Sequence, residues 1–130
     1  HNSVNEFMKL AHLSKAEKAS FYSCIAGDFF KEMLATLSIE KKIHTYFLTD
    51  GHQCIASAVI IHTKKTEMVY NSAFDPDYLS LSPGIVLFGL LIKKAICEKK
   101  AYFDFLRGNE AYKYRLGAID HILLKGVVSP

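Results

Sequence analysis

The chain has 130 residues, of which 50% are apolar and 22% charged, with a formal net charge of +3. This length and composition predict one globular domain over residues 1–130 and exclude a disordered chain. The small charge gives no argument for a nucleic-acid partner. The densest apolar run, Ile85 to Ile92, is too short to cross a bilayer. Because the chain begins at His1 and shows no secretory signal, we expect a piece of a longer protein.

The three cysteines, Cys24, Cys54 and Cys97, are widely spaced and lie among apolar neighbours. An odd number without short spacings argues against a disulfide framework or a zinc site. We therefore expect free, buried thiols in a reducing compartment, and a cytoplasmic protein. No pair of His or Cys residues has the spacing of metal ligands, so we expect no metal.

The N-terminal third is predicted to form helices after an irregular start. Residues 1–13 show no clear period and predict a frayed terminus. Ser14 to Glu17 has the form of a capping box, which predicts a helix as far as about Ala26. Gly27 and Asp28 are expected to end that helix and cap a second one. The apolar face of the second helix comprises Phe29, Phe30, Met33, Leu34 and Leu37.

The next segment has the pattern of strands. Residues 43–49, 54–63 and 66–74 are each predicted to form one strand. Asp50-Gly51 predicts a hairpin turn between the first two, because both residues tolerate a positive φ. The three strands should form an antiparallel meander.

A long helix is predicted after the break at Asp75 to Asp77. Ser82 is expected to cap it, and Pro83 suits its first position. The helix is apolar on nearly every side, so we expect it to be buried against the sheet. The amides of Gly84, Ile85 and Val86 should be free at its start, where an anion such as phosphate is favoured. Since most capped helix starts bind only water, this feature alone is a weak signal.

The C-terminal part is predicted to be strand, loop, short helix and strand. A strand over residues 102–106 places Asp104 among aromatic side chains, and a short helix carries residues 112–115. Ile119 to Val128 is predicted to be the last strand. The strand at 102–106 should return parallel to the third strand, as crossover connections do. The expected fold class is mixed α/β (α+β): an antiparallel meander plus a crossover helix, with helices on both faces.

This order of elements resembles the acyl-CoA N-acyltransferase (GNAT) fold. Two motifs narrow the resemblance: D-P-x-[YF]-x-x-x-S-P-G at residues 75–84 and D-F-L-R-G-x-E-x-Y-K at residues 104–113, followed by Gly117-Ala118. Together they resemble the GNAT-like domain of cellulose-biosynthesis-type acetyltransferases, relatives of the Fem peptidoglycan-bridge transferases. The resemblance covers about residues 20–125. Because members of that family carry a related half upstream, the chain resembles a C-terminal half.

The resemblance implies a donor site and a proton donor. The pyrophosphate of acetyl-CoA or another acyl-CoA would lie at the start of the long helix. The residues at that start are Ser82, Pro83, Gly84, Ile85 and Val86. Tyr112 or Tyr114 would give a proton to the leaving thiolate. For both tyrosines, packing is the alternative role.

The loop before the short helix carries the other candidates. Asp104 and Glu110 could act as a general base or hold an amino group of the acceptor. Alternatively, Asp104 pairs with Arg107 or Lys113 and stabilises the loop. Arg107 and Lys113 are also candidates for binding a phosphate or carboxylate of the substrate.

Three functions fit these features. The leading one is an acyltransferase that moves an acyl group from acyl-CoA to an amine of a sugar or amino acid, in envelope polysaccharide biosynthesis. The second is a Fem-like aminoacyl transferase, which the low charge of +3 disfavours. The third is a GNAT-like binding module without catalysis. The expected partner is a small-molecule or glycan-linked acceptor, without nucleic acid or a membrane span, and an oligomer is compatible with the sequence.

Overall fold

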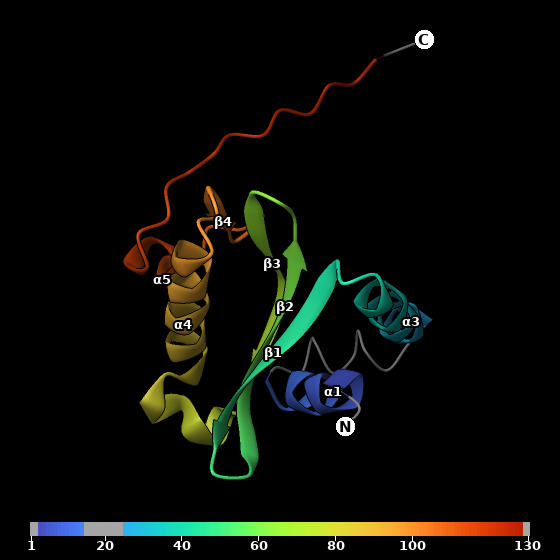
Figure 1. The fold of residues 1–130 in the computed structure, drawn as a ribbon, viewed down its shortest axis with the longest axis vertical. Helices are drawn as coiled ribbons and strands as arrows, with labels where there is room; N and C mark the ends of the chain where they lie inside the picture. The colour runs from blue at the N-terminus through green and yellow to red at the C-terminus, as the bar shows by residue number, and fades with distance from the viewer. Residues whose placement is uncertain (1–2, 15–24, 129–130) are drawn as a thin grey trace.

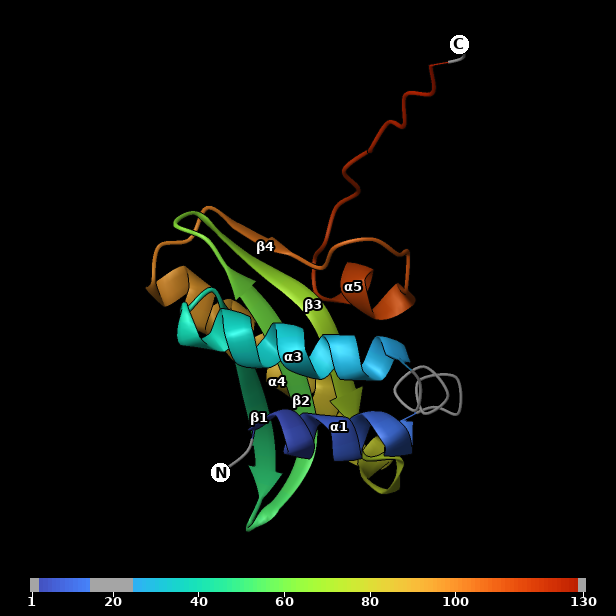
Figure 2. The ribbon, with the colours of Figure 1, turned by 90° about the vertical axis from the view of Figure 1, so that its right-hand side faces the viewer.

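The computed structural model describes residues 3–14 and 25–128, and it consists of a four-stranded sheet between two layers of helix (Figure 1). In chain order the elements are α1 (Ser3–Ser14), α3 (Ile25–Ile39), β1 (Ile43–Asp50), β2 (Gln53–His62), β3 (Thr66–Phe74), the 3-10 helix η1 (Pro76–Leu81), α4 (Pro83–Cys97), β4 (Tyr102–Asp104) and α5 (Ala111–Arg115). Helices α1 and α3 cover one face of the sheet, and α4 covers the other (Figure 2). The predicted mixed α/β architecture is confirmed.

The strand order in the sheet is β1-β2-β3-β4. The first three strands form the predicted antiparallel meander, and Gly51 at its first turn has a φ of 58°. After the α4 crossover, β4 returns parallel to β3, as predicted. The parallel pairing covers only Thr66 to Met68 of β3 and Tyr102 to Asp104 of β4. Beyond Met68, this edge of β3 has no strand partner in the described part of the chain.

Two apolar cores hold the layers together, one on each face of the sheet. The core under α1 and α3 consists of Phe7, Met8, Leu10, Ala11, Phe30, Leu34, Ile43, Val59 and Ala73. The core under α4 consists of Ala56, Ala58, Ile60, Val69, Leu87, Phe88 and Leu91. Residues of β2 enter both cores because successive side chains of a strand point to opposite faces.

The start of the chain is a helix, so the predicted frayed terminus is wrong. Val4, Phe7, Met8 and Ala11 follow the i, i+3, i+4, i+7 spacing, which packs one face of α1 into the first core. Ser14 ends this helix, and the rest of the predicted capping box, residues 15–17, lies outside the described residues. The helix predicted as far as Ala26 lies largely on residues 15–24, outside the described residues.

Helix α3 runs through Gly27 and Asp28, where a helix end and a new cap were expected. Gly27 is buried, where the absence of a side chain permits close packing. Asp28 lies in the first turn, where its charge opposes the positive end of the helix dipole. Its carboxylate also pairs with Lys31 at 3.2 Å. The same residues therefore stabilise the start of one helix.

Helix α4 is buried on one face only, although its composition predicted burial on nearly every side. Leu87, Phe88 and Leu91 face the sheet, whereas Leu90 and Ile96 are exposed. The reason is that the sheet covers one side of the helix, and nothing in the described residues covers the other. Cys97 is also exposed and Cys54 is half-buried, so the expected burial of all cysteines is wrong for Cys97.

Residues 119–128 form no strand, contrary to prediction. They run as an extended segment away from the domain (Figure 1). A segment of alternating apolar residues forms a strand only when the edge of a sheet pairs with its backbone. The last strand of this sheet before the segment, β4, has only three residues, too few to pair with a segment of this length. His121 is therefore exposed rather than set in a strand.

Candidate functional site

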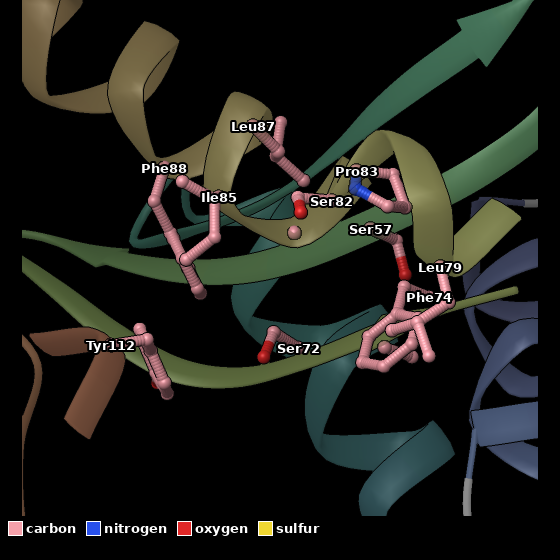
Figure 3. Close-up of a pocket in the computed structure, with 12 residues that line it drawn as sticks. Ser57, Ser72, Phe74, Leu79, Ser82, Pro83, Ile85, Leu87, Phe88 and Tyr112 are labelled. Atoms are coloured by element: carbon pink, nitrogen blue, oxygen red, sulfur yellow. The ribbon is translucent and has the colours of Figure 1, made fainter. Parts of the chain in front are cut away.

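A cavity of about 190 Å³ lies where the start of α4, the end of β3 and α5 meet (Figure 3). Its walls are mostly apolar, with four hydroxyl groups among them. The lining residues are Ser57, Ser72, Ala73, Phe74, Leu79, Ser82, Pro83, Gly84, Ile85, Leu87, Phe88 and Tyr112. The cavity thus joins the two segments that carry the sequence motifs.

The turn before α4 is held by Asp75, whose side chain is buried. Its Oδ1 accepts a hydrogen bond from the amide of Asp77 at 3.0 Å, and its Oδ2 accepts one from Gln53 Nε2 at 3.2 Å. Asp75 therefore caps η1 and ties it to the start of β2. This fixes the entry of the chain into α4.

The first turn of α4 is organised differently from the sequence prediction. Ser82 adopts the left-handed conformation, with φ 49° and ψ 51°, and its side chain makes no capping hydrogen bond. Pro83 takes the first helical position, as predicted. The carbonyl oxygen of Ser82 accepts hydrogen bonds from the amides of Ile85 (2.9 Å) and Val86 (3.2 Å).

Two of the three amides expected to be free are therefore engaged inside the helix. The amide of Gly84 remains without a backbone partner in the described residues, and Gly84 lines the cavity. The positive end of a 15-residue helix also faces this point. An anion at the cavity would meet one free amide and the helix dipole.

Tyr112 forms the opposite wall, on α5. Its ring stacks on Phe88 with centroids 5.5 Å apart and an interplanar angle of 5°. The ring of Phe105 packs edge-on at 6.0 Å. Burial raises the pKa of the phenol, and the charge of Glu110 raises it further. The phenol is therefore held in its protonated form at neutral pH.

Tyr114 lies outside the cavity. It is 42% exposed, and its hydroxyl donates a hydrogen bond to Asp120 Oδ1 at 2.7 Å. This hydrogen bond is the main reason why the pKa of Tyr114 is raised. Of the two tyrosines proposed from sequence, only Tyr112 borders the cavity.

The loop before α5 is tied together by Lys113, which is buried. Its Nζ donates hydrogen bonds to the carbonyls of Arg107 (3.1 Å) and Gly108 (3.2 Å). It also pairs with Glu110 at 2.8 Å. The Lys113 ammonium thus binds its own loop in this structure, and its contact with substrate stays a prediction.

Asp104 is exposed and stabilises a turn. Its Oδ1 accepts a hydrogen bond from the amide of Leu106 at 2.7 Å, and Leu106 has a φ of 55°. This contact replaces the predicted pairing of Asp104 with Arg107 or Lys113. Arg107 and Glu110 are also exposed on this loop.

The structure brings Ser82, Pro83, Gly84 and Ile85 together with Tyr112 around one cavity. The remaining candidates do not line it: Val86, Asp104, Arg107, Glu110, Lys113 and Tyr114. Sequence reasoning missed Ser57, which is fully buried and whose hydroxyl has no hydrogen-bond partner in the described residues. A serine between alanines in an otherwise apolar strand was the available signal.

A second polar cluster lies at the other end of the sheet. Glu67 is buried, and its carboxylate pairs with His62 Nδ1 at 2.5 Å and with Lys100 Nζ at 2.9 Å. Burial alone would raise the pKa of Glu67, but the hydrogen bonds from Lys100 and His62 outweigh it and lower that pKa. His62 is thus paired through Nδ1, whereas its Nε2 is buried without a hydrogen-bond partner in the described residues.

The described residues contain neither a membrane-spanning helix nor a cluster of metal ligands. Over residues 3–14 and 25–128, no helix is long and apolar enough to cross a membrane. Within the same residues, no group of three or more His, Cys, Asp or Glu side chains could hold a metal ion.

The GNAT fold expected from the sequence agrees with comparisons to known proteins. A family model described as an acetyltransferase (GNAT) domain matches residues 2–114. The solved structure of a Trypanosoma brucei acetyltransferase is similar at a TM-score of 0.63 and 15% identity, over 98% of this chain and 93% of that chain. An apo aminoglycoside antibiotic 6'-N-acetyltransferase from Acinetobacter haemolyticus has the same score and identity, over 98% and 92%. No curated protein matches the sequence. The family match does not distinguish the cellulose-biosynthesis-type or Fem-like branch from other GNAT domains. Because it covers most of the chain, the chain belongs to the acetyltransferase (GNAT) domain family.

Proposed function

We propose that this domain transfers an acyl group, acetyl in the simplest case, from an acyl-CoA thioester to an amine. The observation that carries the proposal is that Tyr112 and the first turn of α4 border the same cavity. One side offers a place for the donor phosphates, and the other offers a protonated phenol. The first would hold the donor, and the second would protonate the leaving thiolate.

The donor would bind with its pyrophosphate at Gly84, where a free amide and the helix dipole favour negative charge. The apolar walls beyond, including Phe74 and Leu87, suit the chain that links the phosphates to the thioester. At about 190 Å³ the cavity is smaller than a typical whole-ligand pocket, so it would hold only part of the donor. The unpaired edge of β3 beyond Met68 would receive amide groups of the same arm, as an edge receives an added strand.

The chemical step needs a neutral amine and a proton for the departing sulfur. The amine nitrogen attacks the thioester carbonyl, a C–N bond forms, and the C–S bond then breaks. Tyr112 gives its proton to the leaving thiolate, and the raised pKa of its phenol keeps that proton available. The attacking nitrogen loses a proton to the general base, for which we propose Glu110, and the phenolate of Tyr112 regains a proton from water, so the step is balanced.

For the acceptor we propose an amine of a sugar or amino acid, in envelope polysaccharide biosynthesis. Support for this class comes from the resemblance of residues 75–84 and 104–113 to cellulose-biosynthesis-type acetyltransferases. The exposed side chains of Asp104 and Arg107 would contact this acceptor, and Glu110 would be the general base. A cytoplasmic setting is supported by the free thiols of Cys54 and Cys97.

The test compares Tyr112→Phe with the matched variant Tyr114→Phe. Acetyl-CoA binding is measured by calorimetry, and turnover is measured as release of free CoA with a panel of amino sugars and amino acids. We expect Tyr112→Phe to lower kcat by about 100-fold with little change in acetyl-CoA affinity. Tyr114→Phe should stay within about twofold of the parent, because its hydroxyl points to Asp120.

Equal turnover in both variants would exclude a tyrosine acid. Absence of heat and of a thermal shift at millimolar acetyl-CoA would overturn the donor assignment. The domain would then be a GNAT-like binding module, which is favoured by one observation: Ile85 and Val86 use their amides inside α4.

A further inference from the structure

Lysines gather at one end of the sheet, far from the cavity. The α3–β1 connection, the β2–β3 turn and the end of α4 meet there (Figure 2). We call residues 40–42, 63–67 and 93–102 the basic end. It holds eight lysines and three glutamates, a net charge of +5, whereas the whole chain carries +3. The charge of this protein is therefore strongly one-sided.

Hydrogen bonds join the three segments into one surface. The carbonyl of Lys42 accepts a hydrogen bond from the amide of His62, at the end of β2, at 2.8 Å. The carbonyl of Lys65 accepts one from the amide of Ala101, after α4, also at 2.8 Å. The Lys100 ammonium donates to a carbonyl of the β2–β3 turn at 2.6 Å. The lysines thus belong to one connected surface and not to separate loops.

Most of these lysines have no acidic partner. Three of them pair with the three glutamates of the basic end: Lys42, Lys94 and Lys100. The other five are exposed and form no ion pair within residues 3–14 and 25–128: Lys41, Lys64, Lys65, Lys93 and Lys99. We call these five the unpaired lysines. A partner that fits this surface carries negative charge.

Two of the unpaired lysines occupy positions that favour glycine. Lys41, after α3, has a φ of 55°, and Lys99, after α4, has a φ of 56°. A side chain is strained in this left-handed region, which is why glycine is the usual residue just past a helix. A cation also opposes the helix dipole, but it does so from the last turn without this strain. The charge itself is therefore the reason for a lysine at both positions.

Large apolar and aromatic side chains are exposed among these lysines. Ile39 is 84% exposed, Ile96 70% and Tyr102 69%. Ile96 lies one helical turn after Lys93, on the same face of α4. Lysines beside exposed aliphatic and aromatic side chains are typical of proteins that bind an anionic bilayer, where the cations attract headgroups and the apolar tips enter the interface.

A nucleic acid suits the basic end less well. The basic end contains no arginine, the residue that best recognises phosphates and bases, and Tyr102 is its only aromatic residue. A nucleic-acid backbone also offers no apolar phase for the two isoleucines.

We propose that the basic end binds the surface of a bilayer that contains anionic lipids, with Ile39 and Ile96 at the level of the headgroups. Each lysine near such a surface strengthens binding by about fivefold, so the five unpaired lysines together contribute on the order of a thousandfold. The cavity lies at the other end of α4, about 22 Å away along its 15 residues. The bound domain therefore keeps its cavity open, and the proposal does not depend on the acyltransferase reaction.

The test measures cosedimentation of the full chain with vesicles of phosphatidylcholine, alone or mixed with phosphatidylglycerol. We expect affinity for the mixed vesicles to be at least about 100-fold higher, and to fall as salt is added. Lys41→Gly with Lys99→Gly should lower that affinity about 25-fold. The melting temperature should stay the same or rise, because glycine relieves the left-handed strain.

A second variant and a control complete this comparison. Lys64→Gln with Lys65→Gln, on the exposed turn, should also lower the affinity about 25-fold. The control, Lys9→Gln with Lys31→Gln, removes the same charge outside the basic end and should stay within about twofold of the parent.

Contact with the bilayer is read from Tyr102→Trp, since the chain contains no other tryptophan. Its emission should shift to the blue on mixed vesicles. The proposal is overturned if the parent does not bind mixed vesicles, if the control loses as much affinity as the two variants, or if binding causes no shift. Tighter binding to duplex DNA than to vesicles at the same salt also overturns it, because the surface would then serve a nucleic acid.

Discussion

Replacing Lys113 with Met should detach the loop that carries the second sequence motif. The side chain is 5% exposed, and its ammonium binds the carbonyls of Arg107 and Gly108. A hydrogen bond to a charged group contributes about 1.5–3 kcal/mol, and we take the lower value because both carbonyls belong to exposed residues. The two bonds then contribute about 3 kcal/mol. The ion pair with Glu110, which is 55% exposed, adds less than about 1 kcal/mol.

Urea unfolding followed by circular dichroism measures this loss, which corresponds to a fall in melting temperature on the order of 10 °C. The matched control is Glu110→Gln, which removes the charge that pairs with Lys113 and should cost less than about 1 kcal/mol. The reasoning is refuted if Lys113→Met stays within about 0.5 kcal/mol of the parent. It is also refuted if both variants lose the same amount, because the ion pair would then be the main interaction.

Three further predictions concern other parts of the structure. Glu67→Gln should cost about 3 kcal/mol at neutral pH, since it leaves the half-buried ammonium of Lys100 without the carboxylate that pairs with it. The pKa of Glu67 in the folded protein lies below the ordinary value of 4.5, so the carboxylate stabilises the fold fully above pH 4.5 and loses this effect as the pH falls through the folded pKa. The urea midpoints of parent and variant should therefore converge at low pH. Midpoints that differ by the same amount at every pH would contradict this. Phe88→Ala should cost about 3–5 kcal/mol and remove the stacking against Tyr112, seen as a loss of near-UV circular dichroism. A loss below about 1 kcal/mol would show that the stacking is not formed. In a Cys24→Ser background, Cys97 should react with a thiol reagent at pH 8 about tenfold faster than Cys54, because burial raises the pKa of Cys54; equal rates would argue against the placement of either thiol.

Local patterns predicted the sheet and the crossover because their signals are complete within a few residues. Gly51 marks its turn by its own backbone freedom, and Pro83 marks the start of α4 by its fixed φ. The motif around Tyr112 likewise predicted a short helix after a loop. The sharing of one cavity by Tyr112 and Gly84 was predicted only through the order of the elements, since the two positions are far apart in the chain.

The errors arose where a residue type has two roles and only the neighbours decide between them. Ser14 could cap a helix or bind a strand edge, and its actual partner, Phe74, lies 60 residues away. For Lys113, the sequence did not show that the side chain is buried and binds two carbonyls of its own loop. The amides of Ile85 and Val86 were predicted to be free, but both donate to the carbonyl of Ser82. The left-handed conformation of Ser82, which points that carbonyl at them, has no signal in the sequence.

The hydroxyl of Ser14 joins the first helix to the wall of the cavity. It accepts a hydrogen bond from the amide of Phe74 at 2.8 Å, and it lies 2.7 Å from the carbonyl oxygen of the same residue. One side chain thus replaces a missing strand at that point of the β3 edge. In the course of evolution, position 14 should therefore accept only Ser or Thr, even where the rest of α1 drifts freely among apolar residues. Among related sequences, position 14 should therefore vary less than the charged positions of the exposed loop.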